Sequence, residues 1–516
     1  MSGKKKVLMV LIILVMLATV AAGLAWHMQH YIMVDFQFYP KDAEYLDLRG
    51  QEISVRQYEK LCRRLPGCDV IWDVPLSSGQ YAEDAKQISV PSLTDMDVEL
   101  MEYFLALETV QADGCTDYEQ LMALKKAYPE LEVIYGVTHG QETYANDVKK
   151  AELKKVTAEE LALLPYLTEL KTLTCADAEP EVITQLQEYC HQRELEFGVK
   201  IAGKTYMEDT KKISITKISD EDLELVRFVT GLEELHLKEP KASAENLIGL
   251  VETLPDVKVS WEREVLGVQC STEDEEIDLS EAKITNLKKV EQAMAYFPNV
   301  KQVFLGKTEM DNEALAEFRE KVREDYKVVW VVELGKKLTA RTDDTTFMPT
   351  REHVYYFLDS EAYNLRYCED MICMDLGHMA ITNIDFLEFM PNLEYLVLAH
   401  TQLQHIEPIS HCKKLKFLEL DWAPIKDFTP LLECTALEDL NLGNTYADFE
   451  PIKQMDWLNN LWMVGCSRAA AYQLTQLFGE TMTIMVAGDI TVGGGWRKLD
   501  NYYKMRDLLG MEYMDG

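Results

Sequence analysis

Apolar residues recur in the C-terminal part of the chain with a period close to 22 residues. Copies of the pattern Leu-x-x-Leu-x-Leu begin at Leu393, Leu415, Leu437 and Leu458, and a degenerate copy begins at Met371, so the starts lie 22, 22, 22 and 21 residues apart. Within each copy, alternate apolar side chains are typical of a short strand that faces a core. Because no single copy buries its own apolar face, the pattern predicts repeats that stack.

Residues 43–345 carry a longer version of this pattern, in which strand starts are spaced by 42, 22, 41, 22, 40, 22, 42 and 26 residues. The long intervals contain predicted hairpins at 69–84, 132–147 and 195–209, each with a Gly-containing turn and a Tyr three residues before an Asp. Weaker copies lie at 257–271 and near 326–338. The predicted strands are 46–48, 88–90, 110–112, 151–153, 173–175, 213–215, 235–237, 277–279 and 303–305.

Hydroxyl side chains stand at matching places before the predicted helical segments of these repeats. They are Thr94, Thr157, Ser219 and Thr285. Ser and Thr accept a hydrogen bond from the first turn of a helix, so each is predicted to be an N-cap.

The N-terminus has the pattern of a membrane signal. Lys4, Lys5 and Lys6 precede an uncharged apolar run of 20 residues, 7–26, which is long enough to span a hydrocarbon core of about 30 Å. The lysines predict a cytoplasmic N-terminus and an exported body. The alternative is a cleaved signal peptide and a secreted protein, since small residues at 20–25 offer cleavage positions.

The repeats at 371–465 resemble the leucine-rich-repeat family closely, and those at 43–345 resemble it more loosely. The second halves at Ile406–Ile409 and Phe428–Leu431 are similar to the bacterial internalin-type variant. The resemblance implies an α/β solenoid, horseshoe-like, with a parallel β-sheet on its concave face. The predicted hairpins are then insertions into its N-terminal repeats.

These patterns divide the chain into seven segments. They are a cytoplasmic tail at 1–6, a transmembrane anchor at 7–26, a stalk at 27–42, alternating long and short repeats at 43–345, a junction at 346–370, regular repeats at 371–480 and a C-terminal cap at 481–516. The cap is expected to cover the open end of the solenoid, although Trp496 and Arg497 could alternatively contribute to binding.

The charge balance excludes several classes of partner. The chain has 52 basic and 88 acidic residues, a net charge of −36, and setting aside Lys4, Lys5 and Lys6 leaves −39 for residues 27–516. Nucleic acid needs clustered basic residues, so we expect no nucleic-acid partner. The acidic excess also argues against electrostatic docking on anionic lipid. A neutral or basic protein partner is favoured.

The sequence offers no recognisable catalytic chemistry. It contains no nucleophile elbow, P-loop, dinucleotide fingerprint, H-E-x-x-H or C-x-x-C motif, so we expect neither an enzyme nor a cofactor. The eleven cysteines are an odd number, and only Cys62/Cys68 and Cys368/Cys373 are near enough in sequence to suggest pairs. Five are predicted to be buried thiols of the repeats: Cys115, Cys175, Cys412, Cys434 and Cys466.

The outward-facing positions of the regular strands form the candidate binding surface. Aromatic residues on an open sheet face are typical anchors of a protein interface, unless curvature or the junction segment shields them. We define the predicted binding strip as Tyr395, Phe417, Glu419, Trp422, Asn441, Trp462, His378 and His400.

Two alternatives use the same residues. His378 and His400 lie one repeat apart and, with Asp421, could bind a metal, but a stable site needs a further rigid ligand, and we expect none. Exposed aromatic rings at Tyr395, Phe417, Trp422 and Trp462 could instead stack on carbohydrate of a cell wall. A hydrolase site would need a cleft with convergent His, Asp or Ser in the junction or the C-terminal segment, and the sequence shows none.

Overall fold

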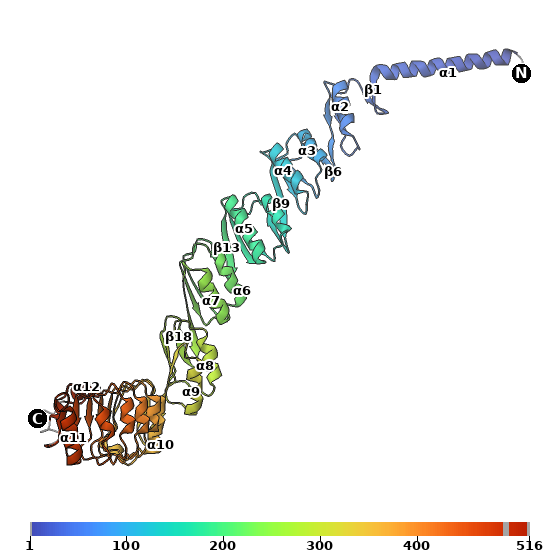
Figure 1. The fold of residues 1–516 in the computed structure, drawn as a ribbon. Helices are drawn as coiled ribbons and strands as arrows, with labels where there is room; N and C mark the ends of the chain where they lie inside the picture. Colours follow the sequence, from blue (N-terminus) through green and yellow to red (C-terminus); the bar gives the residue numbers. More distant parts are fainter. Residues whose placement is uncertain (1–2, 489–494, 513–516) are drawn as a thin grey trace. The chain divides into compact units, whose positions relative to one another are not determined.

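The computed structural model describes residues 3–488 and 495–512 of the chain. It divides into two compact units, Met1–Ile213 with Ile218–Leu235 and Ser214–Lys217 with His236–Gly516 (Figure 1). Residues 1–2 of the predicted cytoplasmic tail and residues 489–494 and 513–516 of the predicted C-terminal cap lie outside the described residues.

The first unit begins with a long apolar helix, α1 (Gly3–His30), whose length and composition are sufficient to cross a membrane. The predicted anchor at 7–26 lies within it. The predicted stalk at 27–42 contains the last turn of α1 and then a hairpin of β1 (Tyr31–Val34) and β2 (Gln37–Pro40).

The body of the first unit is built from modules of parallel strands that each end in a hairpin. Strands β7 (Gln87–Ser89), β8 (Thr109–Ala112) and β9 (Glu132–His139) are parallel, and β10 (Glu142–Ala145) returns antiparallel to β9. The module that follows, β11 to β14, repeats this order. A shorter module, β3 to β6, precedes the module of β7 to β10. The remaining strands are β3 (Tyr45–Asp47), β4 (Asp69–Ile71), β5 (Asp73–Leu76), β6 (Gly79–Ala82), β11 (Lys150–Lys154), β12 (Thr172–Asp177), β13 (Glu196–Ile201) and β14 (Lys204–Met207).

Helices connect the parallel strands of these modules and cover their apolar side. They are α2 (Val55–Arg64), α3 (Asp95–Leu100), α4 (Tyr118–Ala127), α5 (Pro180–Gln192) and α6 (Asp220–Glu224), with the 3-10 helices η1 (Met101–Tyr103), η2 (Glu160–Tyr166) and η3 (Leu225–Phe228). Strands β15 (Lys212–Thr216) and β16 (Glu234–Lys238) each contain residues of both units.

All nine predicted strands of residues 43–345 are present in the structure within one residue of their predicted starts. The first strand of a predicted hairpin has a second role, however. In β9, Glu132–Tyr135 pairs parallel with β8, whereas Gly136–His139 pairs antiparallel with β10. One strand therefore completes the parallel sheet of its module and also begins the hairpin.

A buried aromatic residue recurs in every module, either on that strand or, for Trp72 and Trp330, at the single residue between two consecutive strands. Trp72, Tyr135 and Phe197 in the first unit, and Trp261 and Trp330 in the second, are all almost completely buried. In two of these residues the backbone amide donates a hydrogen bond to a threonine side chain. The amide of Trp261 donates to Thr272 Oγ1 at 3.1 Å, and the amide of Trp330 donates to Thr342 Oγ1 at 3.1 Å. The sequence pattern did not reveal these recurrent buried aromatic residues, because they are Trp, Tyr or Phe in different modules.

Two of the four predicted N-caps are confirmed. Thr94 caps α3 in a capping box with Asp97, and Ser219 caps α6. The other two are wrong. The cap of α8 (Leu287–Met294) is Asn286, one residue after Thr285, and Thr157 precedes a 3-10 helix that begins only at Glu160.

The second unit continues this architecture and ends in a regular solenoid. Its first strands are β17 (Lys258–Val265), β18 (Val268–Ser271), β19 (Glu276–Asp278), β20 (Gln302–Phe304), β21 (Lys327–Val329), β22 (Val331–Glu333) and β23 (Thr339–Arg341). The helices here are α7 (Ala244–Thr253), α8, α9 (Asn312–Lys321), α10 (Asp359–Ala362), α11 (Arg468–Phe478) and α12 (Asp500–Leu508).

A seven-stranded parallel sheet runs through the solenoid in the order β24 to β30, with Leu396, Leu418, Leu440 and Leu461 in register and fully buried. The leucines of residues 371–465 thus stack in successive repeats, as the sequence pattern predicts. The strands are β24 (Thr346–Phe347), β25 (Cys373–Asp375), β26 (Tyr395–Val397), β27 (Phe417–Glu419), β28 (Asp439–Asn441), β29 (Asn460–Trp462) and β30 (Thr483–Met485). The return segments are 3-10 helices: η5 (Tyr363–Tyr367), η6 (Asp385–Phe389), η7 (Glu407–His411), η8 (Thr429–Glu433) and η9 (Pro451–Gln454), while η4 (Arg351–His353) precedes α10.

The predicted junction at 346–370 is a further repeat, which corrects the prediction. Its strand β24 pairs with β25, Phe347 opposite Met374, and Leu365 and Cys368 join the core. Phe347 and Met374 are 27 residues apart, so this repeat is longer than the regular period and interrupts the sequence pattern.

Candidate binding surface

The C-terminal segment lies across the outward face of the repeat sheet. Helix α12 and the 3-10 helix η10 (Trp496–Lys498) pack on that face, alongside the repeats of the solenoid (Figure 1). The predicted cap at 481–516 therefore has two parts: β30 extends the sheet beyond β29 at its end, whereas η10 and α12 cover the face of the sheet. We call the apolar contact the covered cluster: Cys373, Tyr395, Val397, Ala399, Phe417, Trp462, Trp496, Tyr502 and Met505.

Half of the predicted binding strip is buried in or beside this contact. Tyr395, Phe417 and Trp462 are buried, and Asn441 is fully buried. The ring of Trp496 lies 4.8 Å from that of Phe417 and 5.2 Å from that of Trp462, centroid to centroid. The expectation that these aromatic residues are exposed is wrong, because the chain supplies its own apolar cover from a distant segment.

Polar groups fix the segment in one register on the sheet. Trp496 Nε1 donates to Glu419 Oε2 at 2.9 Å, and Asn501 Nδ2 donates to Asp439 Oδ2 at 3.0 Å and to Glu438 Oε2 at 2.9 Å. Burial raises the pKa of Glu419 to about 7 and raises the pKa of Asp439. Because hydrogen bonds are directional, these contacts hold α12 at a defined place on the sheet.

Apart from Glu419, the remaining residues of the strip form a stacked row of rings outside the covered cluster. The rings of His378 and His400 are 4.5 Å apart with 12° between their planes, and the rings of His400 and Trp422 are 5.9 Å apart at 15°. His400 is exposed, and Trp422 is 53% exposed. We call His378, His400 and Trp422 the aromatic column.

The backbone of the aromatic column is left-handed. The φ angles are 65° at His378, 59° at His400 and 57° at Trp422, a region that Asn444 and Gly465 occupy in the next two repeats. Each amide donates to the neighbouring repeat, His400 N to Asp421 O at 2.7 Å and Trp422 N to Gly443 O at 3.0 Å. A bulky residue is disfavoured at this φ, and such strain is frequent at functional positions.

Buried acids lie behind the column. Asp421 is almost completely buried, accepts a hydrogen bond from Asn444 Nδ2 at 3.2 Å and lies 3.7 Å from His400 Nε2. Burial raises the pKa of Asp421 to about 6, and burial raises the pKa of Asp375, which accepts from Gly377 N. Desolvation lowers the pKa of His400. In residues 3–488 and 495–512, no group of three or more His, Cys, Asp or Glu side chains could hold a metal ion.

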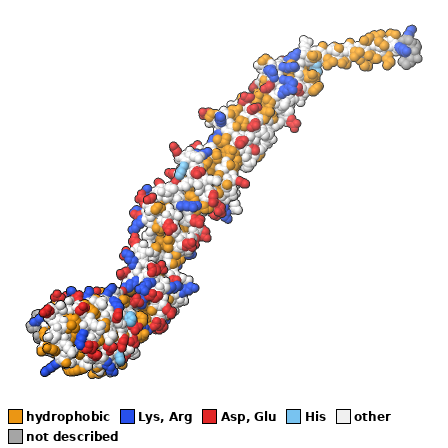
Figure 2. Space-filling view, viewed as in Figure 1, with side chains coloured by type: hydrophobic (Ala, Val, Ile, Leu, Met, Phe, Trp, Pro, Cys, Tyr) orange, Lys and Arg blue, Asp and Glu red, His pale blue; other side chains and the backbone are white. Residues whose placement is uncertain are grey.

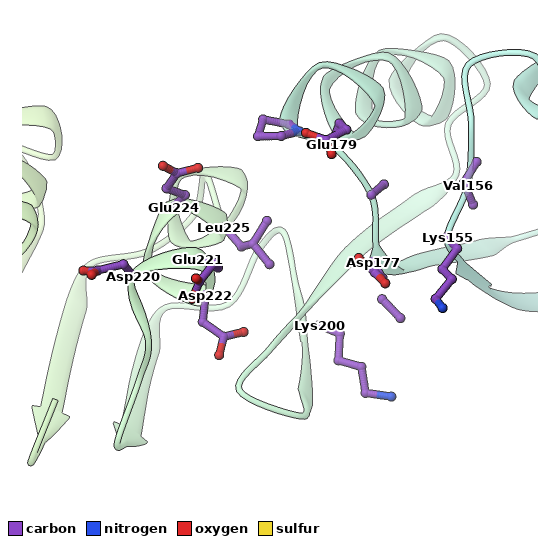
Figure 3. A pocket seen from close by; sticks show the side chains of 13 residues that line it. Lys155, Val156, Asp177, Glu179, Lys200, Asp220, Glu221, Asp222, Glu224 and Leu225 are labelled. Atoms are coloured by element: carbon purple, nitrogen blue, oxygen red, sulfur yellow. The ribbon is translucent and has the colours of Figure 1, made fainter. Parts of the chain in front are cut away.

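An acidic groove of about 760 Å³ lies in the first unit, between the turn after β12 and α6 (Figure 3). Lys200, one of the two lysines beside it, forms an ion pair with Glu152 at 2.8 Å. The groove residues include no His, Ser or Cys, so they offer no nucleophile–base pair. Its acidic residues are Asp177, Glu179, Asp220, Glu221, Asp222 and Glu224.

The cysteines are free thiols in the described structure, including the two pairs that the sequence suggested. Four of the five cysteines that were predicted to be buried are buried, and Cys466 is partly exposed. Burial raises the pKa of Cys412 and of Cys434 to about 12, so both stay protonated at neutral pH.

Comparison with known proteins gives structural neighbours only. No protein-family model and no curated protein matches the sequence. An internalin C2 of Listeria monocytogenes is similar at 16% identity over 38% of this chain and 75% of its own, with a TM-score of 0.23. An internalin F of Listeria monocytogenes is similar at 14% identity over 68% of this chain and 91% of its own, with a TM-score of 0.23. A leucine-rich-repeat protein of Leptospira interrogans is similar at 13% identity over 86% of this chain and 90% of its own, with a TM-score of 0.22.

Proposed function

We propose that this leucine-rich-repeat chain is a membrane-anchored, exported and non-catalytic protein that binds another protein through its aromatic column. Its parallel sheet is then the concave face of a horseshoe-like solenoid. The single observation that carries the proposal is the stacked, partly exposed row of His378, His400 and Trp422 in a left-handed backbone conformation.

Three properties of the column support a protein partner. The backbone hydrogen bonds of His400 and Trp422 fix the main chain and the stacking of the rings restricts the side chains, so little side-chain entropy is lost on binding. Tryptophan is the residue type most often found as an energetic anchor of interfaces. The surrounding carboxylates and the net charge of −36 favour a neutral or basic partner.

The membrane location rests on α1. In the proposed orientation, the three lysines remain in the cytoplasm and residues after α1 lie outside, because positively charged flanks are retained. Cleavage of the N-terminal segment would give a secreted form of the same binding protein.

Substitution of Trp422 by Ala tests the proposed surface. Full-length protein in membranes is treated with a cell-surface crosslinker, and captured partners are compared between native chain, Trp422→Ala and Tyr472→Ala. Tyr472 is the matched control because it is an exposed aromatic residue on α11, outside the column. We expect Trp422→Ala to lose about tenfold or more of the captured partner. Equal capture by all three chains would contradict the proposal.

Carbohydrate is the second candidate, and the stacking geometry makes it less favoured. A sugar packs on the face of an aromatic ring, but the rings of His378, His400 and Trp422 turn their faces to one another. Tyr395, Phe417 and Trp462 are not open to a sugar because the C-terminal segment covers them. Binding of isolated cell-wall glycan, lost in Trp422→Ala, would favour this candidate over a protein.

A further inference from the structure

The hairpin after the apolar helix exposes an unusual apolar tip. Phe36 is 91% exposed and has φ of 71°, and Asp35 beside it has φ of 45°. Two-residue hairpin turns with positive φ at both positions ordinarily use Asn-Gly, because other side chains are strained there. A phenylalanine at this tip is therefore costly in two ways, in backbone strain and in exposed apolar surface.

One whole face of the hairpin shares this character. Met33 and Phe38 are paired across the two strands and both are exposed, whereas Val34 and Tyr39 on the opposite face are buried. Phe38 stacks on His27 of α1 with ring centroids 4.8 Å apart. The exposed face therefore continues directly from the end of the apolar helix.

The hairpin is fixed to that helix without a linker. Strand β1 begins at Tyr31, the residue after α1 ends, and Lys41 donates through its amide to His30 O at 2.9 Å and through Nζ to Met28 O at 2.6 Å. The apolar run of 20 residues spans about 30 Å of hydrocarbon, and the few residues from Trp26 to Tyr31 add about 7 Å. With α1 as the proposed anchor, that distance puts the hairpin at the level of the lipid headgroups.

A basic helix packs beside the hairpin. Helix α2 carries four basic residues and one acidic residue, and two of the basic side chains hold the hairpin: Arg64 Nη1 donates to Met33 O at 3.0 Å, and Lys60 pairs with Asp35 at 2.8 Å. Residues 27–64 contain six basic and six acidic residues, so none of the net negative charge of the exported part lies here. Figure 2 shows blue side chains gathered next to the apolar helix.

We infer that the β1–β2 hairpin and α2 form a second membrane contact. The apolar side chains Met33, Phe36 and Phe38 enter the interface of the outer leaflet, and the exposed Arg56 and Arg63 of α2 bind the phosphates of anionic phospholipid. This inference rests on the proposed anchor. It means that lipid contact depends on local charge and not on the net charge of the whole chain.

Photo-crosslinking of the full-length chain tests the contact. A benzoylphenylalanine is placed at position 36, at position 16 inside α1 or at position 105, and the chain is reconstituted in vesicles of phosphatidylcholine with phosphatidylglycerol. Leu105 is the control because it is 77% exposed and lies far along the chain from the anchor. We expect lipid adducts at 36 and 16 and few at 105. Adducts at 16 but not at 36 would overturn the hairpin contact and leave the anchor intact. Absence at both 16 and 36 would overturn both.

Reversing the charge of two arginines of α2 distinguishes binding to the lipid phosphates from mere closeness of the hairpin to the membrane. Arg56→Glu with Arg63→Glu should lower the adduct yield at position 36 by about fivefold or more in anionic vesicles and little in pure phosphatidylcholine. Lys126→Glu with Lys149→Glu is the matched control, since both lysines are exposed residues of the same unit. Equal yields for the two variants would show that α2 does not bind the phosphates.

Discussion

Single residues explain how the modules of this chain are stabilised. Trp261 is buried, its amide donates to Thr272 Oγ1 and its indole Nε1 donates to Tyr296 O at 2.9 Å. The indole thus joins the hairpin strand to the end of α8, in the module that follows. A large buried ring that also makes a hydrogen bond through its indole has no smaller substitute.

Trp261→Ala should destabilise its module strongly. We expect a loss of about 3–5 kcal/mol, the usual cost of removing a buried aromatic side chain. Native-state hydrogen exchange of β17 and β18 measures it locally. Trp422→Ala should change that exchange little, because Trp422 is half exposed. A similar loss of protection in both variants would contradict the assigned role of Trp261.

Glu419 makes the docking of the C-terminal segment dependent on pH. Its pKa is raised by burial to about 7 while Trp496 covers it, against 4.5 in an exposed carboxyl. Glu419 therefore binds its proton more tightly when the C-terminal segment is docked on the sheet. The docking of this segment should consequently weaken as pH rises from about 4.5 through 7. Asp375, Asp421 and Arg497 are the other charged groups that act on Glu419.

This dependence can be measured by hydrogen exchange of α12 between pH 5 and pH 8, after correction for intrinsic rates. We expect lower protection of α12 at pH 8. Glu419→Gln retains an acceptor for Trp496 Nε1 without a titrating group, so its profile should be flatter. An unchanged slope in this variant would assign the effect to another group.

At the scale of elements, a tyrosine connects two of the predicted hairpins to the following strand. Tyr81 donates through its hydroxyl to Ser89 O at 2.5 Å, and the hydroxyl of Tyr144 donates to Glu152 O, eight residues later in both cases. These contacts explain the Tyr of the Tyr-x-x-Asp pattern in these two hairpins. The hydroxyl bridges two modules of the first unit, which a contact inside the turn would not do.

Tyr144→Phe should loosen this connection. Loss of one partly buried hydrogen bond to a backbone carbonyl costs about 1 kcal/mol. Amide exchange of β10 and β11 should rise about fivefold, while that of β12 and α5 stays constant. Tyr472→Phe is the control. A change spread evenly over the module would show that the ring and not the hydroxyl is responsible.

The sequence predicted the elements better than their tertiary contacts. Periodic leucines such as Leu396 and Leu418 locate strands because each repeat imposes the same local pattern. The junction was missed because its repeat is 27 residues long. The cover on the sheet was missed for a different reason. Trp496 and Glu419 are 77 residues apart, and no period relates them. Of the predicted binding strip, only His378, His400 and Trp422 were left as an aromatic surface.

At the scale of the whole chain, the C-terminal segment completes the second unit. The covered cluster combines residues of β25, β26, β27 and β29 with Trp496, Tyr502 and Met505. Without the segment, the sheet would present a contiguous apolar face larger than a soluble protein ordinarily exposes.

A chain that ends at Gly488 should therefore bind a hydrophobic dye such as ANS much more strongly than the full chain. We expect the repeats themselves to remain folded, because the buried leucine ladder is independent of α12. Far-ultraviolet circular dichroism checks this, and a variant with Tyr472→Ala provides the control. Unchanged dye binding in the shortened chain would mean that the sheet face is not apolar once uncovered.

The position of the covering segment also orders the biogenesis of the protein. Because synthesis proceeds from the N-terminus, Tyr395, Phe417 and Trp462 leave the ribosome before the segment that covers them. During this interval the nascent chain carries an adhesive surface, and only the arrival of η10 and α12 removes it. A chain that stops before Trp496 should consequently have folded repeats and still aggregate, so translation to residues 496–505 decides whether the product is soluble.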